Sequence, residues 1–264
     1  MMFMHTPLSV IKKAGDRLYH DELQVYRGKD FIVSEHIHIH QPSIDEIYEY
    51  GERDYYAMVY NLTATPQTIK SQLWDMQPRI DYTQITQFEL FCCLLHNMYP
   101  QEKTAILFGD LDFRKFGIMQ KEDGSFMLCQ IIDNDMVVID EYTYLMITDF
   151  LRQMHIIEKD EKLPANATTK MILIDDAREE RFKNRGKEYH SQLKNLISAM
   201  INCEEFKYNH SDVWDMKINA FMDSVKRILK IKNANLLLQS AYSGFGGVNL
   251  KDVRKQVDWL GDLD

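Results

Sequence analysis

One glycine-rich stretch near the end of the chain has residue types that could bind phosphate. SGFGG contributes Gly244, Gly246 and Gly247. A dinucleotide-binding turn needs the spacing G-x-G-x-x-G directly after a strand, because the helix that follows supplies amide donors from its N-terminus. Here Asn249 stands where the third glycine belongs, and the segment before the cluster has helical spacing. We therefore interpret Gly244 as a left-handed residue that ends a helix.

Three histidines at alternate positions could bind a metal ion. In EHIHIH, His36, His38 and His40 would lie on one face of a strand, with Ile37 and Ile39 on the other. Neighbouring residues on one face are close enough for two histidines to share a metal. The sequence has no H-E-x-x-H motif and no acidic partner at metal-ligand spacing. We favour a polar strand face, whose contact with a partner would weaken when the histidines are protonated near neutral pH.

Closely spaced aspartates are the remaining candidates for chemistry. They form three pairs: Asp110 and Asp112, Asp133 and Asp135, Asp175 and Asp176. Paired carboxylates can hold magnesium, but aspartates are also common at turns, where they accept hydrogen bonds from backbone amides. The sequence has no P-loop and no G-x-S-x-G motif. We expect no metal, no cofactor and no catalytic site. A metal-dependent enzyme that uses the three histidines or Asp110 and Asp112 is the less favoured alternative.

The composition limits the class of protein. The chain has 264 residues, 45% of them hydrophobic, and a net charge of −9. This much apolar surface is typical of a folded protein, and the acidic balance disfavours a nucleic-acid partner. No apolar run is long enough to span a bilayer, and the first residues do not have the pattern of a signal peptide. The four cysteines include no C-x-x-C pair, so we expect buried, reduced thiols, as in a cytoplasmic protein.

Turn and capping signals predict a mixed α/β N-terminal region over residues 1–139. Residues 21–41 read as a β-hairpin that turns at Gly28. Ser43 and Glu46 have capping-box spacing ahead of a helix to about residue 62, in which Gly51 is a weak point. A further helix should begin at Pro66, and another should follow a second capping box at Thr86 and Glu89.

Short apolar runs then predict a small β-rich insert at about residues 103–139. The expected strands are TAILFGD, FGIMQ, SFMLCQII and MVVID, and Asp123-Gly124 supplies a hairpin turn between the second and third. Asp140 can cap the next helix, and the chain should be helical from there to residue 264, with a loop at EKDEKLPANAT. One of these helices, KMILIDDAREERFKNRGK, has the alternating charges of a solvated surface. The sequence thus predicts an α+β fold that is predominantly α-helical.

A helix near the C-terminus has an apolar stripe that could face either the core or a partner helix. Its spacing is close to 3, 4 and 7 residues. The stripe consists of Phe221, Met222, Val225, Leu229 and Leu236, which are the candidate partner-binding residues. The same helix is locally basic, and we favour a solvated face over a nucleic-acid contact for Lys226, Arg227, Lys230 and Lys232. Methionines of the helical C-terminal part, residues 140–264, could form an adaptable groove. Core packing is the favoured interpretation for Met146, Met154, Met200, Met216 and Met222.

Two stretches resemble a known protein family. QPSIDEIYEYGERDYYAMVYNLTATP resembles the N-terminal region of tail-assembly proteins from phages of Gram-positive bacteria. NAFMDSVKRILKIKNANLLLQSAYSGFGGVNLKDVRKQVDWLG resembles the C-terminal part of the same proteins. These are grouped with tail assembly chaperones, which are mostly helical and coat the tape-measure protein before the tail tube polymerises. The resemblance covers about a third of the chain and does not include the β-rich insert.

The resemblance implies a non-enzymatic phage tail assembly chaperone. The implied partners are the tape-measure protein or other tail proteins, with a homo-oligomer as a further option and without nucleic acid or membrane. The implied location is the cytoplasm of the bacterial host, or the virion. The alternative function is a virion structural protein, such as a neck, tail-completion or baseplate component.

Overall fold

The structure is a computed structural model that describes residues 22–243, 253–261 and 263. Its first elements are helix α1 (Glu22–Tyr26) and a two-stranded antiparallel sheet of β1 (Phe31–Ser34) and β2 (Ile37–Ile39). The predicted hairpin over 21–41 is therefore wrong in its first half, and the chain reverses between Ser34 and Ile37. Gly28 does adopt a positive φ of 81°, but it follows a helical turn.

A tertiary contact explains this difference. The side-chain amide of Gln41 donates hydrogen bonds to the backbone oxygens of Val25 (2.9 Å) and Lys29 (2.7 Å). Gln41 and Val25 are both buried. These bonds satisfy the carbonyl of Val25, in α1, and that of Lys29, just after α1. In a strand, such carbonyls would instead accept from a neighbouring strand. The residues of α1 themselves do not contain this information, because Gln41 follows the β1–β2 hairpin.

The helices that follow begin close to their capping signals. Helix α2 (Ile44–Tyr50) and helix α5 (Gln87–Leu90) each start with a complete capping box, which confirms both predictions. Gly51, with φ of 98°, separates α2 from α3 (Glu52–Leu62), so the predicted single helix is broken at its weak point. A π-helical turn, η2 (Phe91–Leu95), continues α5.

The helix expected at Pro66 begins later, as α4 (Lys70–Asp75). The Thr68 hydroxyl donates to the backbone oxygen of Thr65 (2.8 Å), and its oxygen accepts from the Thr65 N–H (3.0 Å). These side-chain bonds hold a turn and compete with helical backbone bonds.

The predicted β-rich insert is only partly correct. TAILFGD lies in helix α6 (Gln101–Phe108), not in a strand. Thr104, Leu107 and Phe108 are buried on one side of it, and a short apolar run does not distinguish this pattern from a buried strand. After the 3₁₀ turn η3 (Phe113–Lys115), the other three predicted strands are confirmed.

Those three strands form an antiparallel sheet in the order β3-β4-β5. They are β3 (Gly117–Gln120), β4 (Phe126–Ile132) and β5 (Asp135–Ile139). Gly124, with φ of 86°, lies in the turn between β3 and β4, as predicted. Asp133 and Asn134 both have positive φ values, 49° and 70°, and form the tight turn between β4 and β5. The predicted cap at Asp140 is also confirmed, because its side chain accepts from Thr143 N–H (2.9 Å).

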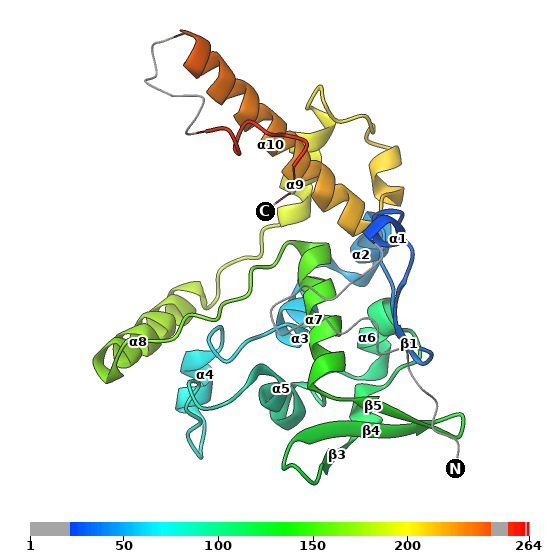
Figure 1. The fold of residues 1–264 in the computed structure, drawn as a ribbon, viewed down its shortest axis with the longest axis vertical. Helices are drawn as coiled ribbons and strands as arrows, with labels where there is room; N and C mark the ends of the chain where they lie inside the picture. Colours follow the sequence, from blue (N-terminus) through cyan, green and yellow to red (C-terminus); the bar gives the residue numbers. More distant parts are fainter. Residues whose placement is uncertain (1–21, 244–252, 262, 264) are drawn as a thin grey trace.

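Helix α7 (Glu141–His155) lies at the centre of the molecule (Figure 1). It contacts β1, β5, α5 and the last long helix, so side chains from both halves of the chain contribute to one core. The boundary at residues 139 and 140 stays a prediction.

The C-terminal part is helical and extends away from this core. Helix α8 (Ala167–Asn184) projects to the left beside α4, while α9 (Gln192–Ile201) and α10 (Ile218–Ser243) lie at the top of the view (Figure 1). A 3₁₀ turn, η4 (Asp212–Asp215), precedes α10. The predicted α+β, predominantly α-helical fold is thus confirmed. No helix in the described part of the chain is long and apolar enough to cross a membrane.

Candidate functional site

The three histidines of EHIHIH line a groove of about 520 Å³. Strand β2 buries Ile37 and Ile39 and directs the histidines outward, so the predicted alternation is confirmed. Residues 105–111, which include the end of α6, form the other side of the groove. Its acidic lining residues are Asp30, Glu35, Glu46 and Asp110.

Two of the three histidines, His36 and His40, pair with separate carboxylates instead of converging on one point. His40 lies between two of them, with Nδ1 2.8 Å from Asp30 Oδ1 and Nε2 3.1 Å from Glu46 Oε1. His36 Nε2 lies 3.3 Å from Asp135 Oδ2. Within the residues that the structure describes, no group of three or more histidine, cysteine, aspartate or glutamate side chains could hold a metal ion. The groove therefore offers charged hydrogen-bonding groups, but among the described residues it has no cluster of side chains that could coordinate a metal ion.

Glu46 links three parts of the structure, β2, α2 and α10, at one end of this groove. Its carboxylate accepts from Ser43 N–H (2.6 Å), contacts His40, and lies 3.3 Å from Lys217 Nζ at the start of α10. Burial raises the pKa of Glu46, but the Ser43 hydrogen bonds and the charges of Lys217 and His40 outweigh burial and lower the pKa to about 2. The carboxylate is ionised at neutral pH and fastens β2 and α2 to α10.

The aspartate pairs do not act together. Asp110 lines the groove, whereas Asp112 caps η3 by accepting from Arg114 N–H (3.1 Å). Asp133 lies in the β4–β5 turn, and Asp135 contacts His36. In α8, Asp175 pairs with Arg178 at 2.7 Å. The contacts of Asp112 and Asp175 are local interactions of the kind expected at turns and on solvated helices, whereas the contact of Asp135 with His36 joins two distant segments.

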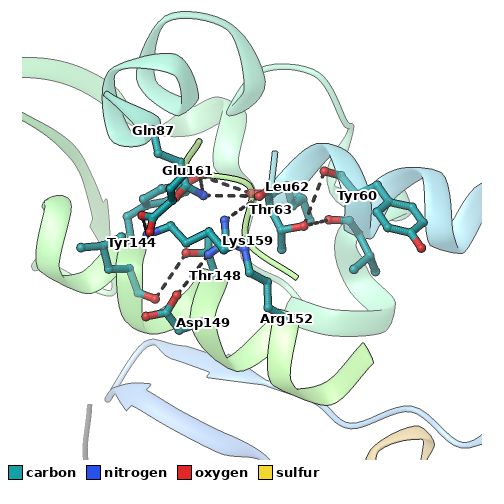
Figure 2. Close-up of polar contacts among 12 residues, drawn as sticks. Tyr60, Leu62, Thr63, Gln87, Tyr144, Thr148, Asp149, Arg152, Lys159 and Glu161 are labelled. Atoms are coloured by element: carbon teal, nitrogen blue, oxygen red, sulfur yellow. Dashed lines mark hydrogen bonds and ion pairs between the residues drawn. The ribbon is translucent and has the colours of Figure 1, made fainter. Parts of the chain in front are cut away.

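A buried polar cluster, which the sequence did not predict, joins α7 to the end of α3 (Figure 2). Arg152 donates from Nη2 to the backbone oxygen of Thr63 (2.6 Å) and from Nη1 to Asp149 (3.1 Å). Gln87 Nε2 donates to the Tyr144 hydroxyl (3.2 Å) and lies 3.4 Å from the same Thr63 oxygen. Burial lowers the pKa of Arg152, and the nearby Tyr144 and Asp149 offset only part of that shift. The cluster satisfies carbonyl groups that the helix end leaves unpaired.

The predicted apolar stripe of α10 is divided between the core and the surface. Phe221 and Met222 are buried, and Val225 packs against the core. Leu229 and Leu236 are 56% and 63% exposed. Since these two leucines lie seven residues apart, they point in similar directions from the helix. Tyr242, six residues further along, is also exposed. Of the five candidate residues, only Leu229 and Leu236 present most of their side chain to solvent.

The remaining candidates have structural roles or lie outside the described residues. Arg227 of the basic segment donates to the backbone oxygens of Trp259 and Gly261, and Lys232 lies 3.6 Å from Glu205. The predicted burial of thiols is correct for Cys92 and wrong for Cys93, which is exposed; Cys129 and Cys203 are half-buried. The cluster Gly244, Gly246 and Gly247 lies outside the described residues, and so does the predicted helix end. Core packing is confirmed for four methionines that are buried: Met154, Met200, Met216 and Met222.

One comparison with known families gives a match. The family described as YomV second domain matches residues 183–264, from the end of α8 to the C-terminus. Neither a curated protein nor a solved structure matches the chain. The match includes α9, α10 and the exposed leucines of α10. The C-terminal part of the chain is therefore similar to a phage-associated domain family, which fits a phage protein.

Proposed function

We propose that the protein is a non-enzymatic tail assembly chaperone of a phage, which binds apolar helical segments of the tape-measure protein in the host cytoplasm. One observation carries the proposal: the segment that is similar to a phage-associated family exposes Leu229 and Leu236 on a long helix. A tape-measure protein is a long helical chain with apolar stripes, which would aggregate if they stayed exposed. A partner helix with its own apolar side chains can cover such a stripe.

The charge of the protein supports the same role. A net charge of −9 keeps a complex with an apolar partner in solution. The leucines of α10 are separated by polar positions such as Lys232 and Asn233, so the free helix surface is not a continuous apolar patch. This pattern suits a surface that is exposed before its partner arrives.

The test is co-expression with the tape-measure protein from the same phage. We expect a soluble complex that co-purifies, and a tape-measure protein that aggregates when expressed alone. In the variant with Leu229→Gln and Leu236→Gln, the recovered complex should fall by about tenfold, as expected when two apolar side chains leave an interface. Leu163→Gln is the matched control, because Leu163 is an exposed leucine outside α10.

Two results would contradict the proposal. A tape-measure protein that is soluble alone and never co-purifies would exclude the chaperone role. If mass spectrometry of purified phage particles finds the protein in stoichiometric amount, the alternative applies, and the protein is a structural component of the virion. A chaperone should be absent from the particles or present only in trace amount.

A further inference from the structure

The free edge of strand β3 has the properties of a strand that pairs with another strand. All four of its residues, Gly117–Gln120, are exposed. Strand β3 pairs with β4 on one side, in a regular register without a bulge. Within the described residues, no strand pairs with its other side. Proteins protect free edges with charged residues, prolines or bulges, and the sequence Gly-Ile-Met-Gln contains no such charge or proline.

The backbone groups that face outward can be assigned from the ladder. Lys121 N–H donates to Ser125 O (2.7 Å), so Lys121 faces β4. Successive residues of a strand alternate in direction, and Met119 and Gly117 therefore also direct their N–H and C=O groups to β4. Ile118 and Gln120 direct theirs to the free edge. Their backbone groups are available for another strand.

The charges around β3 favour a second copy of the same chain as the other strand. Exposed basic residues, Arg114 and Lys115, precede β3, and exposed acidic residues, Glu122 and Asp123, follow it. If two copies of β3 pair antiparallel about a two-fold axis, the basic start of each copy lies against the acidic end of the other. With Met119 opposite its own copy, Lys115 lies opposite Asp123 and Ile118 lies opposite Gln120. Cross-strand pairs of opposite charge stabilise a sheet.

We propose that the protein forms a two-fold symmetric dimer in which the β3 strands of two copies pair antiparallel. The two three-stranded sheets then form one continuous sheet. Ile118 and Met119, which are about half exposed in the single chain, become covered by the partner strand. The residues of this interface lie outside the segment 183–264 and outside α10, so the inference is independent of the proposed function.

Analytical ultracentrifugation of the full chain tests the proposal. The wild-type protein should sediment at twice the mass of 31.2 kDa as its concentration is raised. Ile118→Pro removes an N–H that faces the free edge and leaves the β3–β4 bonds in place, so this variant should remain a folded monomer. Ile118→Lys, which places a charge at the interface, is a second variant with the same expected result. Circular dichroism confirms that each variant is folded.

A control variant distinguishes edge pairing from packing between sheet faces. Ile131, on β4, is 75% exposed and lies on the outer face with Met119 and Met136. Ile131→Gln should therefore leave the dimer intact. A monomeric wild-type protein at every concentration would overturn the proposal. The same conclusion would follow if Ile131→Gln dissociated the dimer while Ile118→Pro did not.

A charge exchange tests the orientation of the two strands. Lys115→Glu should raise the dissociation constant of the dimer by about three- to thirtyfold, because two symmetric attractive pairs become repulsive. Adding Asp123→Lys to the same chain should recover at least about threefold of that loss, because the residue opposite position 115 then has the opposite charge. The two residues are too far apart along one strand to compensate within a single chain. An additive double variant would overturn the antiparallel arrangement.

Discussion

The Tyr55 hydroxyl lies 2.6 Å from Nε2 of His155, and both side chains are buried. His155 Nδ1 lies 2.7 Å from the backbone oxygen of Leu151. Because a carbonyl oxygen only accepts, Nδ1 carries the proton, and Nε2 accepts from the Tyr55 hydroxyl. The bond joins α3 to the end of α7, which are separated by most of the N-terminal sequence. His155 is therefore held in its neutral form.

Removing the Tyr55 hydroxyl should destabilise the protein. Tyr55→Phe leaves Nε2 of His155 buried without a donor, and we expect a loss of about 1–3 kcal/mol in the free energy of unfolding. Urea unfolding measures the change. Tyr60→Phe is the control, because Tyr60 lies on the same helix and is exposed. Equal stability of the Tyr55→Phe variant and the wild type would show that the bond makes no net contribution.

Protonation of His155 should make stability depend on pH. Burial lowers the pKa of His155 from 6.5 to about 4. The unfolded chain therefore binds a proton near pH 6.5 that the folded chain binds only near pH 4. Stability is complete above pH 6.5 and falls as the pH decreases towards 4, by up to ~3 kcal/mol. Glu46 affects the same curve only below its unfolded pKa of 4.5.

Urea unfolding at several pH values between 7 and 5 tests this expectation for the wild type and for His155→Gln. Glutamine can still accept from Tyr55 and donate to Leu151, but it does not titrate. The difference between the two slopes isolates His155 from the other histidines. If both proteins lose stability equally over this range, another group is responsible.

Local chemistry in the sequence predicted several elements correctly. The capping boxes at Ser43 and Thr86 and the turn at Gly124 depend on residues within a few positions, so the sequence contains their full cause. The alternation of EHIHIH predicted the face of the three histidines for the same reason. The partners of His40 could not be predicted, because Asp30 and Glu46 come from two other segments.

Tertiary contacts decided the elements that were predicted wrongly. Gln41 stabilises α1 from beyond the hairpin, and the apolar run in TAILFGD suits a buried helix as well as a strand. The burial of Arg152 and its hydrogen bond could not be predicted from the sequence for the same reason. Its helix shows an ordinary amphipathic pattern, and its acceptor, Thr63, lies far away in the sequence.

Ion pairs should control the position of α8. Arg178 and Arg181 on α8 both contact Asp75 on α4, and Lys170 contacts Asp81. Ile174 is the one buried residue of helix α8, all of whose residues the structure describes. Asp75→Asn should therefore release the C-terminal turns of α8 and increase their rate of limited proteolysis several-fold. High salt should have the same effect on the wild type, because exposed pairs are screened.

A variant of the same helix provides the control. Lys183→Ala removes an exposed pair within α8, with Glu179 (3.1 Å), and leaves the contacts with α4 in place. Its proteolysis should differ little from that of the wild type. Equal cleavage of the Asp75→Asn variant and the wild type would show that Asp75 does not hold α8.

Arg152 should stabilise the protein mainly through its hydrogen bond to the Thr63 carbonyl at the C-terminal end of α3. Arg152→Met fills a similar volume and leaves the Thr63 carbonyl with only the longer contact to Gln87 (3.4 Å) (Figure 2). We expect a loss of about 1–3 kcal/mol, typical of a buried acceptor that loses its donor. Asp149→Asn is the matched control, since it removes the charge partner and leaves the Thr63 bond. A larger loss for Asp149→Asn than for Arg152→Met would show that the ion pair, and not the hydrogen bond to the backbone, accounts for the stabilising effect of Arg152.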